Sequence, residues 1–148
     1  MESDTHQRLA RALARDKLIK EKRRIGKILL DIPCLTLLGF AEDSGILVAY
    51  SGFPNITLNS LPFSSLHTDV RNEIVDAWVK RCLDHANIGL DFYLCIASPT
   101  LVRCVSTADR CWVLPLWERL RSKELSFLSF DCNALLRLRH SGFLYSAY

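Results

Sequence analysis

Cysteine and histidine are the residues of this 148-residue chain best suited to chemistry, as nucleophiles or metal ligands. No two cysteines have the short spacing of a zinc-binding pair, and no two histidines lie one helical turn apart. We therefore expect no metal site and no cofactor. Most of the cysteines stand in apolar stretches and are expected to be buried free thiols, and the pairing of any two stays open. They are Cys34, Cys82, Cys95, Cys104, Cys111 and Cys132.

Motifs for other kinds of catalysis are missing from the sequence. The six glycines are never close together, so there is no glycine-rich loop to hold a phosphate. A serine nucleophile would need a G-x-S-x-G turn, which does not occur. We expect a protein that is not an enzyme. A small enzyme whose site is assembled only in three dimensions remains the second alternative.

Two stretches have the composition of a contact surface. Residues 51–65 are rich in turn-forming residues but also carry large apolar side chains, and long apolar loops are often functional. Residues 112–123 combine tryptophan with basic side chains, which are types enriched at interface hot spots. The predicted partner-binding residues are Phe53, Ile56, Leu58, Trp117, Arg119 and Arg121.

Positive charge is concentrated at the N-terminus. Residues 1–27 contain nine basic and four acidic side chains, whereas the other 121 residues contain ten basic and twelve acidic ones. A basic segment beside a nearly neutral body favours attraction to an anionic partner. The first alternative is therefore a nucleic-acid-binding protein that uses Arg8, Arg11, Arg15, Lys20, Arg23 and Arg24.

The composition bounds the class of protein. With 49% apolar and 24% charged residues, the chain can fill one globular core, and we predict a single domain over residues 1–148. The longest apolar run, residues 32–41, is too short to span a membrane. The first residues lack the pattern of a secretory signal, so we expect a cytoplasmic protein.

The elements that position these residues follow from hydrophobic spacing and turn residues. We expect a long basic helix at residues 4–30 (within a segment 1–31 whose first half is free to project), a strand hairpin at 35–40 and 46–50, and a helix at 66–86. Further strands are expected at 90–97, 101–106, 111–114 and 125–130, a short helix at 116–123, and a closing helix at 132–140 capped by Asp131. This order predicts an α+β fold with a mainly antiparallel sheet of about 4–6 strands packed by the helix at 66–86.

These features together favour a non-catalytic protein-binding module. In size and fold class the chain resembles the bacterial immunity proteins, which neutralise a partner toxin by occluding its active site. The resemblance implies a protein partner, such as a toxin domain, and recognition by complementarity rather than by reactive groups. The oligomeric state does not follow from the sequence.

Overall fold

The computed structural model describes residues 2–57, 59–97, 100–120 and 124–148, and it divides into two compact units. The first unit, residues 1–31, consists mainly of helix α1 (Glu2–Ile28), as the sequence predicts. Lys20 and Asp16, which are one helical turn apart, form an ion pair at 3.0 Å. The second unit, residues 32–148, contains the sheet and the remaining helices.

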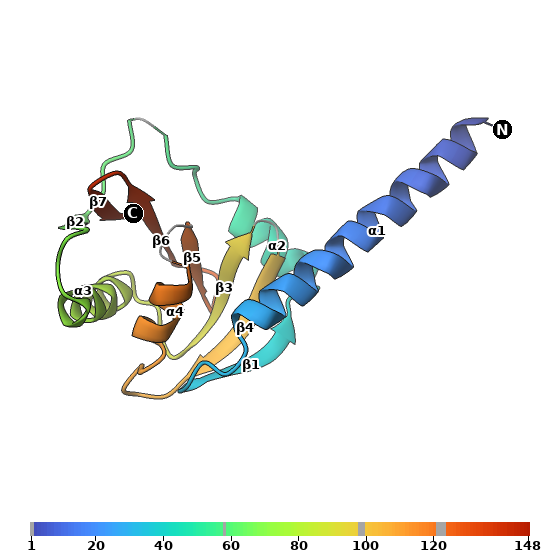
Figure 1. The fold of residues 1–148 in the computed structure, drawn as a ribbon. Coiled ribbons are helices and arrows are strands. Elements are labelled where there is room, and N and C mark those ends of the chain that lie inside the picture. Colours follow the sequence, from blue (N-terminus) through green and yellow to red (C-terminus); the bar gives the residue numbers. More distant parts are fainter. Residues whose placement is uncertain (1, 58, 98–99, 121–123) are drawn as a thin grey trace. The chain divides into compact units, whose positions relative to one another are not determined.

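A seven-stranded sheet forms the centre of the second unit (Figure 1). Every pair of neighbouring strands is antiparallel, and the spatial order is β1-β4-β3-β5-β6-β7-β2. The α+β class and the antiparallel sheet are confirmed, with more strands than expected. The strands are β1 (Leu35–Phe40), β2 (Ser64–His67), β3 (Asp91–Ala97), β4 (Thr100–Ser106), β5 (Leu125–Ser129), β6 (Leu135–Ser141) and β7 (Leu144–Ala147).

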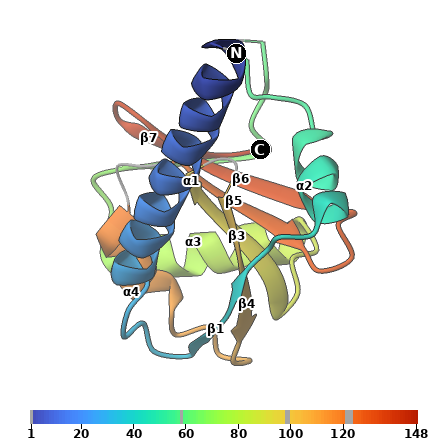
Figure 2. The ribbon, with the colours of Figure 1, turned by 90° about the vertical axis from the view of Figure 1, so that its right-hand side faces the viewer.

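Helices cover both faces of this sheet. Figure 1, and Figure 2 from the side, show α2 (Ser44–Ser51) apart from α3 (Asn72–His85) and α4 (Val113–Leu120). The α3–α4 face has a core of aromatic rings, in which Phe92 and Phe127 lie 5.6 Å apart between ring centroids. On the α2 face, Tyr93, Cys95, Leu101 and Leu128 form a buried cluster. Successive side chains of a strand point to opposite faces, so the two cores alternate along each strand.

The expected strand at residues 46–50 is wrong, because this segment is helix α2. Asp43 caps the helix with its Oδ1, which accepts a hydrogen bond from the Gly45 amide at 2.7 Å. Ile46, Leu47 and Tyr50 then pack on the cluster of the α2 face, at the spacing of one helix side. The neighbour of β1 is the distant β4 and not the segment that follows it.

The expected helix at residues 132–140 is also wrong, because strand β6 lies there. Asp131 caps a turn: its Oδ1 accepts hydrogen bonds from the Ser129 hydroxyl at 2.6 Å and the Asn133 amide at 3.0 Å. Cys132 completes the turn with a φ of 64°. The chain therefore reverses and pairs β6 with β5, so that Leu136 and Leu138 are buried against the α3–α4 core.

Smaller differences concern element boundaries. Helix α3 begins six residues later than expected, because Leu66 and His67 end strand β2. The expected strand at 111–114 is absent, and helix α4 begins at Val113. The register of β1 against β4 shifts between Leu37 and Gly39, where Gly39 has a φ of 113°. No helix in the described ranges is long and apolar enough to cross a membrane. The prediction of one domain stays a prediction.

Candidate binding face

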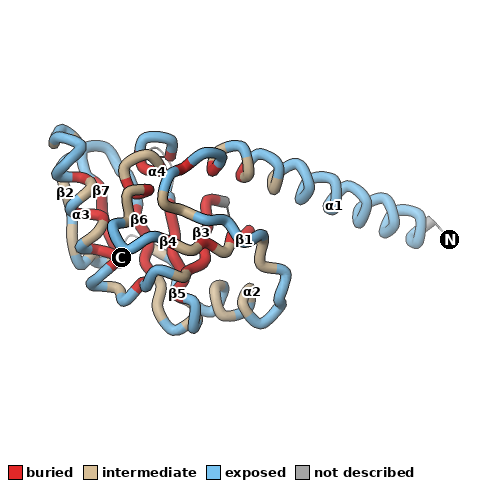
Figure 3. Tube along the Cα trace, turned by 90° about the horizontal axis from the view of Figure 1, so that it is seen from below, coloured by how far each residue is buried: buried red, intermediate tan, exposed pale blue. Residues whose placement is uncertain are grey.

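The segment 52–63 leaves α2 and returns to the sheet over strand β6. At its far end, the Phe63 amide donates a hydrogen bond to the Ala147 carbonyl at 2.9 Å, which extends the pairing of β2 with β7. Within it, the Thr57 amide donates to the Ser60 hydroxyl at 2.8 Å, and the Ser60 amide donates to the Thr57 carbonyl at 3.1 Å. Most of the segment is exposed, whereas Leu136, Arg137 and Leu138 of β6 are buried (Figure 3 colours the chain by burial). The loop is thus anchored to β7 at its far end and stabilised by hydrogen bonds between Thr57 and Ser60.

Arg137 lies under this loop on the α2 face of β6. Its backbone pairs with Tyr148, with N–H to carbonyl distances of 3.1 and 2.9 Å in the two directions. Its Nη1 donates to the Pro54 carbonyl at 2.6 Å, and its guanidinium carbon lies 5.9 Å from the centre of the Tyr50 ring. The residue is only 8% exposed. The sheet and the loop thus fix a buried cation in one orientation.

Among the described residues, no carboxylate forms an ion pair with this buried cation. A guanidinium has five N–H donors, and the hydrogen bond to Pro54 uses one of them. The Nε is buried without a hydrogen-bond partner, and the part of the chain that the structure describes supplies no carboxylate to Arg137. Arg103 provides a contrast, because it forms a two-point pair with Asp91 at 3.0 and 3.3 Å. Burying an unpaired charge is costly, so its position needs a cause other than stability.

Two cavities adjoin Arg137, and both are lined in part by the loop. The larger, of about 510 Å³, is lined largely by polar side chains from α2, the loop and β6. The smaller, of about 300 Å³, is lined mostly by apolar side chains of the loop and β6. The larger is lined by Leu47, Tyr50, Ser51, Asn55, Ile56, Glu124, Arg137 and Arg139. The smaller is lined by Phe53, Pro54, Asn55, Ile56, Ser60, Leu61, Phe63, Leu135, Arg137 and Tyr148. These residues form the Arg137 face.

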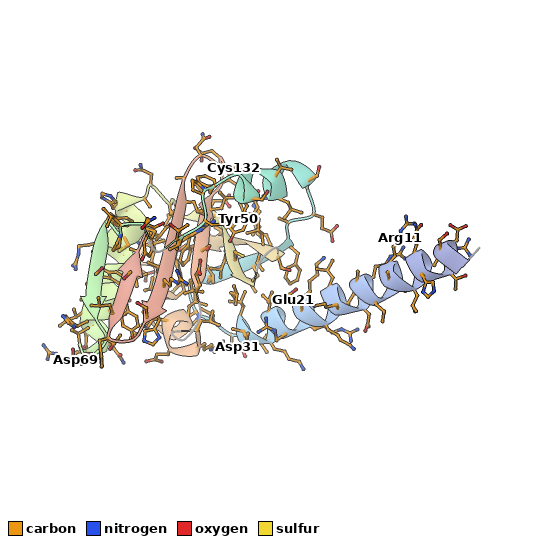
Figure 4. All side chains as sticks on the ribbon, turned by 90° about the horizontal axis from the view of Figure 1, so that it is seen from above. Arg11, Glu21, Asp31, Tyr50, Asp69 and Cys132 are labelled. Carbon is orange, nitrogen blue, oxygen red and sulfur yellow. A yellow bond between two sulfur atoms is a disulfide. The ribbon has the colours of Figure 1, made fainter. Side chains whose placement is uncertain are left out.

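The charges around the larger cavity favour an anion. Two arginines and one glutamate line it, and both Arg139 and Glu124 are exposed. Burial raises the pKa of Tyr50 to about 12, with a hydrogen bond to Cys95 adding to the rise, so its phenol is neutral at physiological pH. Figure 4 labels Tyr50 and Cys132, which both pack on the core cluster of the α2 face. The phenol is a neutral polar group beside the cation.

The structure brings two predicted contact residues to the Arg137 face and places Trp117 and Arg119 on helix α4, away from it. Ile56 lines both cavities, and Phe53 lines the apolar one while also packing on the core cluster. Trp117 is 6% exposed and packs edge-on against Trp78 and Tyr145, so its ring belongs to the core of the α3–α4 face. Arg119 is exposed on α4. Leu58 and Arg121 lie outside the described residues.

The residues predicted for nucleic-acid binding all lie on helix α1. Arg8, Arg11 and Arg15 are exposed and, at their spacing, share one side of the helix. The others are Lys20, Arg23 and Arg24.

Sequence reasoning missed the central residue of the site. Arg137 and Arg139 were assigned to a helix, in which they would not share a face. A signal for the strand was present, because Leu136, Arg137, Leu138 and Arg139 alternate apolar and charged residues at the period of a strand. The cavities form because the loop 52–63 lies over strand β6. No local sequence pattern predicts that these two segments are neighbours.

The cysteines also differ from expectation, because Cys34 and Cys111 form a disulfide. It joins the turn before β1 to the residues before α4. Cys104 is a buried free thiol, as are Cys82 and Cys95. Asp109 lies close to the pair, and one ligand atom from each of these three residues falls within 4.8 Å of the others. Both sulfurs are used by the disulfide, so this group has metal ligands to offer only in its reduced form.

Comparison of the chain with protein-family models, with curated proteins and with solved structures finds no match.

Proposed function

We propose that this protein is a non-catalytic protein-binding module and that the Arg137 face is its contact surface. The observation that carries the proposal is the open apolar cavity beneath residues 52–63, which the chain's own side chains leave unfilled. Leu61 stands at this cavity with 89% of its surface exposed. Exposed apolar groups around a cavity are typical of surfaces that a partner covers.

The charges define the chemistry of that partner. Arg137 borders the apolar cavity, and Arg139 lies two residues further along β6, on the same face of the strand. A segment that carries an apolar side chain together with an acidic group would fill the cavity and meet the cations. The partner we propose is therefore a protein segment that is both apolar and acidic. Its identity as a toxin, as for an immunity protein, stays a prediction.

Site-specific photo-crosslinking tests the proposal. A photoreactive phenylalanine analogue at position 61 is expected to give one discrete protein adduct in native-cell extract, and the same analogue at position 73 is not. Glu73 is an exposed residue of α3, the helix on the other face of the sheet from α2, and serves as the matched control. The purified adduct partner is then expected to bind the Ile56→Asp variant at least about tenfold more weakly than the parent chain.

Two outcomes would contradict this proposal. Adducts of equal intensity at positions 61 and 73 would mark non-specific contact. An unchanged affinity of the purified partner for the Ile56→Asp variant would place its contact elsewhere on the molecule.

A second candidate, nucleic-acid binding through helix α1, is favoured by one observation. Arg8, Arg11 and Arg15 share one side of the helix, and within the described ranges none of them has an ion pair. Phosphate contacts release counterions, so binding would weaken steeply with salt. If all three arginines contact phosphates, replacing them with glutamine lowers the slope of log K against log salt by about 3. Failure to retain a duplex or a single strand at low salt excludes this candidate.

A further inference from the structure

The Arg137 guanidinium is held in place but not satisfied, and this combination identifies a ligand site. The Pro54 carbonyl and the Tyr50 ring fix its orientation, yet the Nε is buried without an acceptor. Positioned charges that lack a partner inside the protein are characteristic of sites completed by a ligand. The Nε is closed off from solvent, so an anion in the adjoining cavities would meet the guanidinium at its Nη atoms.

We propose that the Arg137 face binds a carboxylate that the partner carries next to an apolar side chain. The proposal rests on the protein-binding function, and it specifies the group that the partner inserts. A planar guanidinium matches the two oxygens of a carboxylate, with which it can form paired hydrogen bonds. Arg139 supplies a second positive charge at the same cavity.

The lining of the larger cavity selects a monoanion. Its charged side chains are Arg137, Arg139 and Glu124, which sum to one positive charge. A doubly charged phosphate would meet the Glu124 carboxylate and would lose more hydration on entry than a carboxylate. A single carboxylate balances the site without excess charge.

The apolar cavity would bind the apolar side chain that lies next to the carboxylate. Arg137 borders both cavities, so an anion held there leaves its neighbouring group close to the 300 Å³ space. Ile56, Leu61 and Leu135 line that space and would cover an apolar side chain of moderate size, whereas the Phe63 ring at its edge is stacked on His85. The C-terminal residue of a peptide has this arrangement, with its carboxylate and side chain on the same Cα. An internal glutamate followed by an apolar residue is the other source of the same chemistry.

Titration of the full-length purified chain with short peptides tests the proposal and separates the two sources. The probes are acetyl-Gly-Gly-Leu with a free carboxylate, the same peptide with a C-terminal amide, and the amide of acetyl-Gly-Glu-Leu. The free-carboxylate peptide is expected to bind at least about tenfold more tightly than its neutral amide, as loss of a charged hydrogen-bond pair requires. Tight binding of the glutamate peptide instead assigns the carboxylate to an internal side chain and supports the same site.

Matched variants show whether binding occurs at the Arg137 face. Arg139→Gln is expected to weaken the free-carboxylate peptide about tenfold, and Arg137→Lys is expected to weaken it as well, because the planar two-point geometry is lost. Arg71→Gln removes the same charge from an exposed position before α3 and is expected to change nothing. Arg139 is exposed, so its variant keeps the test valid even if a substitution at Arg137 prevents folding.

The proposal is overturned if the amide of acetyl-Gly-Gly-Leu binds as tightly as the free acid. It is also overturned if inorganic phosphate binds more tightly than both carboxylate peptides, or if the Arg139→Gln and Arg71→Gln variants behave alike. Peptide binding without a crosslink at position 61 would retain the carboxylate site and contradict the protein-binding function. A crosslinked partner that binds the Arg139→Gln variant with unchanged affinity would retain the protein-binding function and contradict the carboxylate site.

Discussion

At the scale of single residues, Arg137 and Arg103 show that two arginines of one sheet face serve different purposes. Arg103 donates to both oxygens of Asp91, and the pair is half exposed, which is an ordinary surface arrangement. Arg137 is deeper, has one hydrogen bond and borders two cavities. A charge that is buried at a cost and left open to a cavity is better explained by binding than by folding.

The first prediction compares stability with binding at Arg137. Removing the buried charge with Arg137→Met keeps a similar volume, so the free energy of unfolding is expected to stay the same or to rise by about 1 kcal/mol. The same variant is expected to lose carboxylate binding. Urea unfolding, with Arg103→Met as the comparison expected to lose stability, measures the difference. A clear loss of stability in Arg137→Met would mean that the guanidinium is structural.

Tyr50 gives a pH dependence that belongs to a single side chain. Burial raises its pKa from 10.0 to about 12, so the folded chain holds the phenol proton more tightly than the unfolded chain does. This contribution to stability is complete below pH 10 and is lost as the pH rises to about 12. Between these pH values, unfolding free energies of Tyr50→Phe are expected to fall less than those of the parent chain. Parallel curves for the two proteins would contradict this expectation.

At the scale of elements, the strands and helices whose buried side chains form a long, regular apolar pattern could be predicted from the sequence. The hairpin of β3 and β4 follows from two apolar runs joined by a short turn, and α3 follows from Val75, Val79 and Cys82 at helical spacing. Segments 46–50 and 132–140 were misassigned because each is short and has a pattern that both element types accept. Their state is decided by distant partners: β4 occupies the place beside β1, and β5 pairs with β6.

The candidate site was harder to predict than the elements, because its residues come from segments far apart in the sequence. Phe53 and Ile56 could be chosen because apolar residues in a long loop are unusual, and the structure places both at the Arg137 face. Arg137 is not among the predicted contact residues, because the sequence pattern places it in a helix, where an arginine beside leucines is ordinary. Its importance arises from the Pro54 carbonyl, which is 83 residues away along the chain.

The disulfide between Cys34 and Cys111 is expected to contribute to the free energy of unfolding. It closes a loop between residues 77 positions apart, and such a bond restricts the unfolded chain. Reduction is expected to lower the free energy of unfolding by about 2–4 kcal/mol. Urea unfolding with and without dithiothreitol measures this loss. The Cys34→Ser, Cys111→Ser double variant serves as the control, because its stability is expected to be insensitive to the reductant.

At the scale of the whole molecule, the two units are expected to act separately. Residues 32–148 contain all seven strands and the Arg137 face, whereas the basic side chains of residues 8–27 lie on α1. Protein binding and attraction to an anionic polymer would then be independent properties of one chain. The first depends on shape and a buried charge, and the second on exposed charge and salt.

Deletion of residues 1–24 tests this independence. The shortened chain is expected to bind the free-carboxylate peptide with unchanged affinity and to give the same circular dichroism in the β region. Any salt-dependent retention of nucleic acid is expected to disappear with the deleted residues. Calorimetric titration and filter binding measure the two properties, and a loss of peptide affinity on deletion would show that the units cooperate.

The two ends of the strand order also have a consequence for how the molecule behaves in concentrated solution. An open sheet exposes unpaired backbone groups that can recruit strands of other copies and start fibrous aggregation. Here one terminal strand, β1, is interrupted by the register shift at Gly39, and the other, β2, is only four residues long. Neither end offers a long, regular row of donors and acceptors. We therefore expect little edge-to-edge association between copies, although the sheet is not closed into a barrel.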